Sequence, residues 1–209
     1  MEEIYDLLKQ LVDPESIIKI GGISLLLFVI FAETGLFVGF FLPGDSLVFI
    51  AGIFCVSHPE IMDVNIIELE LLMISAAVAG NVVGYWFGHR MGKRLYKRKD
   101  SFFFKKRHLE TTKSYYDQNG RNTIIIGRFL PIIRTFAPIV AGIIKMDFKK
   151  FMIYNTLGAI LWIGTFTTLG YYFGNIPWVQ NNIGIIVIAL IIITLIPLLK
   201  VYFSRGKNK

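Results

Sequence analysis

The stretch Phe-Leu-Pro-Gly-Asp at residues 41–45, followed by Ala-Gly-Ile at residues 51–53, decides the fold because the chain contains a second version of it. The second version is Phe-Leu-Pro at residues 129–131, followed by Ala-Gly-Ile at residues 141–143. In both versions a proline interrupts an apolar run. Proline lacks the backbone N–H that a helix needs, and its ring crowds the preceding turn. The two stretches therefore predict two interrupted helices, related as an internal repeat.

The composition indicates that this repeat lies in a membrane. Of the 209 residues, 54% are hydrophobic and only 18% are charged, and the mean hydropathy is +0.58. A soluble domain has too little interior to bury so much apolar surface, so we predict an all-α polytopic membrane protein. A net charge of +7 would suggest a nucleic-acid partner for a soluble protein. Here the placement of the charge beside apolar segments argues for no nucleic acid.

The apolar segments divide the chain into three parts. Residues 1–16 place apolar side chains on one helical face and predict an amphipathic amino-terminal helix. Residues 17–182 predict the main membrane domain. Residues 183–209 predict a last spanning helix followed by a basic tail. We expect the main domain to carry the function, because the repeat lies inside it.

Within the main domain, the sequence predicts two re-entrant hairpins, at about 17–56 and about 122–144. It also predicts two spanning helices, at about 71–88 and about 151–174. A spanning helix needs about 20 apolar residues, and the arm after the first break is shorter than that. A hairpin that enters and leaves on one side explains both the break and the short arm. The residues expected to break the hairpins are Pro43, Gly44, Pro131 and Pro138.

Basic residues predict the orientation of these segments. Residues 89–121 contain eleven Lys or Arg, half of the chain's 22, and short basic loops favour the cytoplasmic side. That loop and the carboxyl terminus are then cytoplasmic, and the two hairpins enter from opposite sides as an inverted repeat. The motif Gly-Tyr-Trp-Phe-Gly at 84–88 also resembles Gly-Tyr-Tyr-Phe-Gly at 170–174. The tryptophans are expected as packing or interfacial anchors.

Four charged residues lie in or beside the hairpins: Glu33 and Asp45 in the first copy, Arg128 and Arg134 in the second. A charge deep in a bilayer costs at least about 2.5–3.5 kcal/mol, so these side chains predict a polar cavity inside the protein. The arginines suit phosphate oxygens. The acids could exchange a proton, because burial and a neighbouring arginine affect their protonation in opposite directions. The alternative is a pair of purely structural salt bridges.

Other chemistry finds little support in the sequence. Asn81 and Asn155 could line the cavity or bond across helices. Cys55 is the single cysteine, and the three histidines show no metal-ligand spacing, so no metal and no cofactor are expected. No phosphate-binding P-loop, nucleophile elbow or zinc-protease motif occurs. We therefore do not expect an enzyme, and a lipid phosphatase is the least favoured reading.

The chain resembles the DedA family of membrane proteins, which shares its core with the VTT-domain proteins. The resemblance covers about residues 25–175 and implies a multi-pass protein of the bacterial inner membrane with two opposing re-entrant hairpins. It implies recycling of lipid-linked phosphate, in particular undecaprenyl phosphate, with dependence on the proton-motive force. Asp45 stands where the family often has Glu. The residues that carry this family resemblance are Glu33, 41–45, Ala51-Gly52, Gly80-Asn81 with Gly84, Gly127–Phe129, Pro131, Arg134, Ala141-Gly142, Met146, Asn155, Gly158-Ala159 and Trp162.

The leading hypothesis is a flippase for an anionic lipid phosphate. Arg128 and Arg134 would bind the phosphate, and Glu33 and Asp45 would be the proton-coupling acids. The partners are then the lipid phosphate substrate, membrane lipids and protons. The alternatives are an uncoupled phospholipid scramblase, a proton-coupled transporter of a small ion or solute, and a structural membrane protein.

Overall fold

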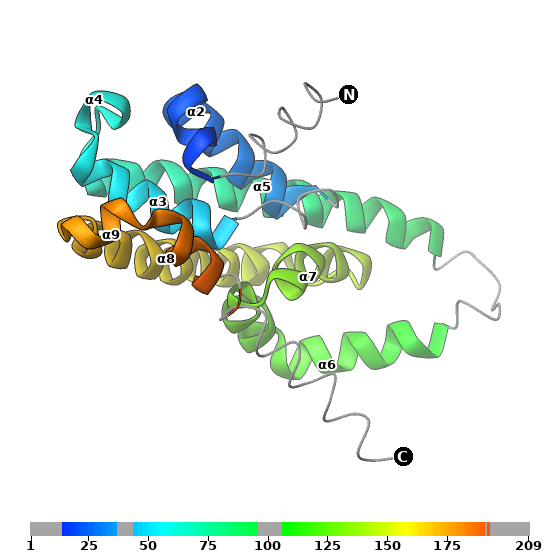
Figure 1. Cartoon of the computed structure of the whole chain (residues 1–209). Helices are drawn as coiled ribbons and strands as arrows, with labels where there is room; N and C mark the ends of the chain where they lie inside the picture. Colours follow the sequence, from blue (N-terminus) through cyan, green and yellow to red (C-terminus); the bar gives the residue numbers. More distant parts are fainter. Residues whose placement is uncertain (1–13, 37–43, 96–105, 191, 193–209) are drawn as a thin grey trace, which may run out of the picture. The chain divides into compact units, whose positions relative to one another are not determined.

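The computed structural model describes residues 14–36, 44–95, 106–190 and 192, and this part of the chain is helical with no strand (Figure 1). The all-α prediction is therefore confirmed for the described residues. The predicted helix at 1–16 lies almost wholly outside them, as do Pro43 and most of 183–209. The helices are α2 (Pro14–Gly35), α3 (Gly44–Ser57), α4 (Pro59–Met62), α5 (Ile66–Leu95), α6 (Lys106–Ile125), the 3₁₀ turn η2 (Ile126–Phe129), α7 (Pro131–Ile143), α8 (Phe148–Phe173) and α9 (Pro177–Asn181).

Three of these helices are long and apolar enough to cross a membrane: α2, α5 over Ile66–Gly92, and α8. A span needs about 20 residues, whereas α3 has 14 and α7 has 13. The arm after the first break was expected to be too short to span, and α3 is that short. The re-entrant course of the two hairpins stays a prediction. Residues 89–121 were expected as a loop, but α5 runs on to Leu95 and α6 begins at Lys106. Much of this basic segment is helical.

The helices form two compact units. The first contains residues 14–30, 44–73 and 163–190 of the described chain, and the second contains residues 31–36, 74–95 and 106–162. Along the chain, α5 begins in the first unit and ends in the second, whereas α8 begins in the second and ends in the first. Each unit therefore contains one short apolar helix and the carboxyl-terminal part of one long helix.

In the first unit, α3 packs directly against the end of α8 through glycine. A methyl group added at Gly52 would collide with the carbonyl oxygen of Thr167, and one added at Gly170 would collide with that of Phe49. Two helix backbones approach this closely only where a side chain is missing, a common arrangement in membranes. Phe49 and Ile53 of α3 also form a buried cluster with Val179.

The second unit contains the same kind of contact between α7 and the end of α5. A methyl group at Gly142 would collide with the carbonyl oxygen of Tyr85, and one at Gly88 would collide with that of Ile139. The sequence match paired 84–88 with 170–174, but Gly88 occupies the place that Gly170 has in the first unit. That match is therefore shifted by one helical turn from the pairing that the contacts indicate.

This packing gives a stability prediction. Replacing Gly142 with Ala should destabilise the protein by about 1–3 kcal/mol, because the added methyl group meets backbone that cannot rotate away. Gly164 of α8 has no neighbour within 4 Å of an added methyl group. Gly164→Ala should therefore be neutral or stabilise by up to about 1 kcal/mol. Thermal unfolding in detergent measures both, and equal melting temperatures for the two variants would contradict the close contact.

The prolines of the second hairpin have different effects. Leu130 is extended, with φ −110° and ψ 112°, and α7 starts at Pro131. A residue before proline disfavours the helical region, and proline suits the first helical position, so the chain breaks here as expected. Pro138 lies inside α7, which continues to Ile143. The expectation of a second break at Pro138 is wrong for this helix, because proline removes only one intrahelical hydrogen bond there.

Candidate functional site

Glu33 near the end of α2 and Arg134 in the first turn of α7 form a buried ion pair. The Nη2 atom of Arg134 donates a hydrogen bond to Oε1 of Glu33. Their exposed fractions are 2% and 3%. An acid of the first predicted hairpin therefore neutralises a base of the second, although 101 residues separate them. Breaking such a pair on one side leaves a buried charge, which costs about 3–5 kcal/mol.

Arg128 is held differently, through hydrogen bonds to an asparagine. It lies in η2 with only 1% of its surface exposed. Its Nη1 atom donates to the backbone oxygen of Asn155 at 2.7 Å and to the Oδ1 atom at 2.8 Å. Its Nε and Nη2 atoms have no hydrogen-bond partner among the described residues. Arg128 is thus a buried cation with donors still available.

Both arginines lie over one aromatic ring. The guanidinium carbon of Arg134 is 4.3 Å from the centre of the Trp162 ring, and that of Arg128 is 5.8 Å away. Trp162 in α8 is completely buried. A cation over an indole face is attracted by the ring's quadrupole, most strongly when water is excluded. Trp162 therefore has both guanidinium groups within cation–π distance of its ring.

Two asparagines join α5 and α8 beside Arg128. Asn81 donates from Nδ2 to Oδ1 of Asn155 at 2.7 Å, and both are buried. Turned about its last bond, the Asn81 amide would instead donate to the backbone oxygen of Thr34 at 2.9 Å and accept from Arg128 at 3.3 Å. Either orientation keeps Asn81 in one polar group with Arg128. The sequence left open whether the asparagines face a cavity or each other, and in this structure they bond to each other.

Small residues make this arrangement possible. A methyl group at Gly80 would collide with Oγ1 of Thr34, so α2 approaches α5 closely just beside Glu33. At Gly158, an added methyl group would lie 3.4 Å from Cδ of Arg128. Gly80, next to Asn81, therefore leaves room for the helix that carries Glu33. Gly158, three residues after Asn155, leaves room for Arg128. Larger side chains there would displace the acid or the base.

Asp45 lies in the first unit, whereas Glu33, Arg128 and Arg134 lie in the second. It stands in the first turn of α3 and is 7% exposed. A carboxylate is favourable at that end of a helix, because the backbone N–H groups there point toward it. That all four charges line one cavity stays a prediction.

Trp162, like the other two tryptophans, was expected to be packing or an interfacial anchor, and its contact with the two arginines was missed. Trp86 and Trp178 are 54% and 61% exposed, as anchors would be, but Trp162 is not exposed at all. The signal was its spacing from Asn155. Seven residues are close to two helical turns, which puts both side chains on one face of α8.

The arrangement can bind an anion. Two arginines near one ring present several N–H donors, and charge-assisted bonds to phosphate or carboxylate oxygens are the strongest that they form. Arg134 already donates one of these hydrogen bonds to Glu33. No cluster of three metal-binding side chains occurs among the described residues. These two guanidinium groups are suited to the recognition of an anion.

Comparison with known families shows which family the chain belongs to. The model of the VTT domain matches residues 42–172, which include both short apolar helices and both arginines. This chain belongs to the DedA family. Protein DedA of Escherichia coli K12 is 41% identical over 174 residues, covering 83% of this chain and 78% of the relative.

Two further members show the spread of the DedA family. The uncharacterized membrane protein ML0287 of Mycobacterium leprae is 34% identical over 90% of this chain and 82% of its own length. The inner membrane protein YqjA of Escherichia coli K12 is 30% identical over 76% of this chain and 70% of its own length. No solved structure matches this chain. The DedA family is one of membrane proteins, in agreement with the three membrane-capable helices.

Proposed function

We propose that this DedA-family protein is a proton-coupled flippase for an anionic lipid phosphate, with undecaprenyl phosphate as the substrate that the family resemblance favours. It would act as a transporter and not as an enzyme. Arg128 and Arg134 bind the phosphate group, and Glu33 and Asp45 exchange the proton. We place the protein in the bacterial inner membrane with a cytoplasmic carboxyl terminus.

The observation that carries the proposal is the state of Arg128. A buried guanidinium with two nitrogen atoms lacking acceptors in the described structure is costly to maintain, because desolvation of a charge is repaid only by good partners. A purely structural role would not need such a group. A phosphate oxygen would supply the missing acceptors, and the neighbouring Arg134 lies over the same ring.

The Glu33–Arg134 ion pair suggests how a proton is coupled to the phosphate. The carboxylate occupies the donor that a phosphate would need, so the two anions compete for Arg134. Protonation removes the negative charge of Glu33 and releases Arg134. Phosphate binding then requires one proton at Glu33, and the more acidic side of the membrane loads the substrate. An acidic exterior would drive the lipid phosphate inward.

The matching glycine contacts support an inverted repeat as the framework for this exchange. Positions in α3 correspond to positions in α7, such as Gly52 to Gly142, and the end of α8 corresponds to the end of α5, such as Gly170 to Gly88. The two long helices also run through the units in opposite order. Transporters with inverted repeats bind substrate near the midplane, between related broken helices.

The proposal is tested in liposomes with the purified protein and fluorescent undecaprenyl phosphate. We expect inward movement to accelerate when the outside is acidified, and to slow toward the protein-free rate when the gradient is removed with an ionophore. A dithionite-type quenching assay measures the lipid in each leaflet. Inward movement that ignores the gradient would show a scramblase, and movement of soluble phosphate but not lipid would show a solute transporter.

A further inference from the structure

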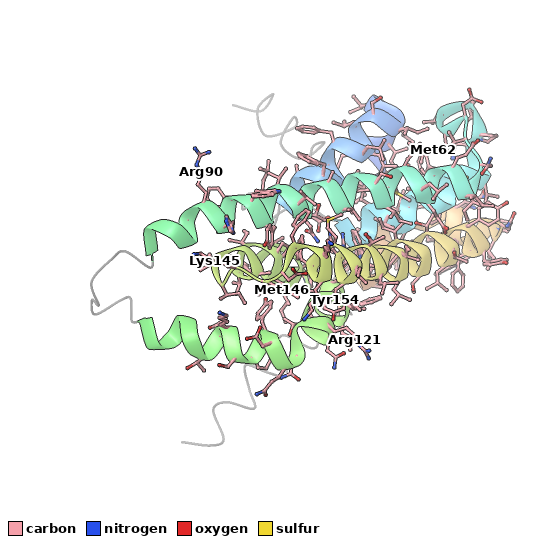
Figure 2. The ribbon with its side chains drawn as sticks, turned by 180° about the vertical axis from the view of Figure 1, so that it is seen from behind. Met62, Arg90, Arg121, Lys145, Met146 and Tyr154 are labelled. Atoms are coloured by element: carbon pink, nitrogen blue, oxygen red, sulfur yellow. The ribbon has the colours of Figure 1, made fainter. Side chains whose placement is uncertain are left out.

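A polar cavity lies between α6 and the start of α8, and neither Arg128 nor Arg134 lines it. Its volume is about 140 Å³. One water molecule requires about 10–15 Å³, so the cavity could hold several. Figure 2 shows Arg121 at the end of α6, Met146 before α8, and Tyr154 on α8 around this region. All lining residues belong to the second unit. The space is large enough for a small polar group.

The lining carries charges of both signs that do not neutralise each other. Arg121 and Lys150 are its cations, and Asp117 and Asp147 are its anions. Arg121 is four residues from Asp117 on α6, a spacing that often gives an ion pair. Yet neither cation forms an ion pair with either carboxylate among the described residues. A purely anionic ligand would meet the two carboxylates, so the lining favours a ligand that also carries a positive group.

The other polar groups of the wall show which side chains are available. The hydroxyl of Tyr116 donates to the backbone oxygen of Ala137 at 3.3 Å. Burial raises the pKa of Tyr116 well above its usual range, so this hydroxyl keeps its proton. Asp147 accepts from the backbone N–H of Lys150 at 2.9 Å and so caps α8. Arg121, Lys150 and Asp117 keep their side chains available to a ligand.

Aromatic side chains beside Asp147, at the start of α8, indicate the level of the membrane surface. Phe148 follows Asp147 directly, and its ring lies 5.7 Å from that of Trp86. Both side chains are exposed, at 38% and 54%. Exposed tryptophan gathers at membrane–water interfaces, where lipid headgroups lie. The exposed Lys149 and Lys150 follow Phe148 directly, as expected beside anionic headgroups.

We propose that this cavity binds a zwitterionic phosphoester headgroup of the phosphoethanolamine type, as a site separate from the buried arginines. Arg121 and Lys150 hold the phosphate oxygens, and Asp117 holds the ammonium group. Tyr154, next to Asn155 in α8, connects the wall of this cavity to the residue that holds Arg128. The site goes beyond the proposed transport and does not depend on it.

The test measures binding of short-chain phosphatidylethanolamine to the full-length protein in detergent by native mass spectrometry. The double variant Arg121→Gln with Lys150→Gln should weaken binding at least tenfold. Lys149→Gln, an exposed neighbour that does not line the cavity, should leave binding unchanged. Thermal unfolding of each variant establishes that it is folded. Equal binding by the double variant and Lys149→Gln would overturn the proposal.

Two further arms identify the ligand chemistry. Asp117→Asn should abolish the preference for phosphatidylethanolamine over phosphatidic acid, and an unchanged preference would overturn the role of the carboxylate. Free O-phosphoethanolamine that binds as tightly as the lipid would assign the site to a soluble phosphoamine, whereas much weaker binding would assign it to the lipid. Arg128→Met should keep binding. Loss of binding in that variant would place the ligand at the buried arginines and refute a separate site.

Discussion

Replacing Arg128 with Met is expected to reduce lipid transport at least about 100-fold while changing the free energy of unfolding by no more than about 2 kcal/mol. The loss follows from two missing charge-assisted bonds to phosphate, each about 1.5–3 kcal/mol, and each 1.4 kcal/mol is a factor of ten. Stability changes little because the substitution also removes the cost of burying a charge, which offsets the lost bonds to Asn155.

Arg134→Met provides the contrast. That substitution leaves the Glu33 carboxylate buried without its cation, so both transport and stability should fall, the latter by about 3–5 kcal/mol. Arg90 on α5 is exposed, and Arg90→Met serves as the matched control with wild-type behaviour. Liposome flipping and thermal unfolding are measured on all three variants. If Arg128→Met is as unstable as Arg134→Met, then Arg128 is structural and the phosphate assignment fails.

The second large effect concerns Glu33. Changing Glu33 to Gln should make transport insensitive to a pH gradient, because the neutral amide cannot exchange a proton or compete with phosphate as an anion. Binding of a soluble phosphate monoester should also lose the part of its pH dependence that Glu33 contributes, and only the titration of the phosphate itself should remain. In the unmodified protein, protonation of Glu33 should strengthen binding as the pH falls. The measurement is the ratio of flipping rates with and without the gradient, which should approach one in the variant.

Glu70 offers a suitable control for that experiment. It lies in α5 within the first unit and accepts a hydrogen bond from Thr168 at 3.0 Å. Glu70→Gln should retain the gradient response, since this acid bonds to the Thr168 hydroxyl and has no role in the proposed coupling. A Glu33→Gln protein that still responds fully to the gradient would move the coupling role to another acid, with Asp45 the next to test.

Composition and proline placement were enough to predict the helical class and the short apolar helix after the first break. They were not enough to predict the detail of the second hairpin. Pro131 and Pro138 have the same chemistry, yet only Pro131 begins a helix, because Leu130 before it takes an extended conformation. The sequence contains no local signal for that difference. It is decided by the packing of α7 against α5, through Gly142 and Gly88.

The charged residues themselves were predictable, but their arrangement was not. Arg128 and Arg134 are six residues apart, a spacing that separates them on an ideal helix. The 3₁₀ turn and the extended Leu130 between them rotate the chain so that both reach Trp162. The ion pair of Arg134 with Glu33 joins residues 101 positions apart. Only the tertiary structure determines which of the available acids meets which base.

The burial of Trp162 also gives the protein a built-in optical reporter. Indole emission depends on the polarity and charge around the ring, and Trp162 has two guanidinium groups over it. The other two tryptophans are largely exposed, so their emission lies at longer wavelength and can be removed by replacing them with Phe. The fluorescence of the remaining indole would then follow each arrival of an anion at the arginines, in unlabelled protein and in real time.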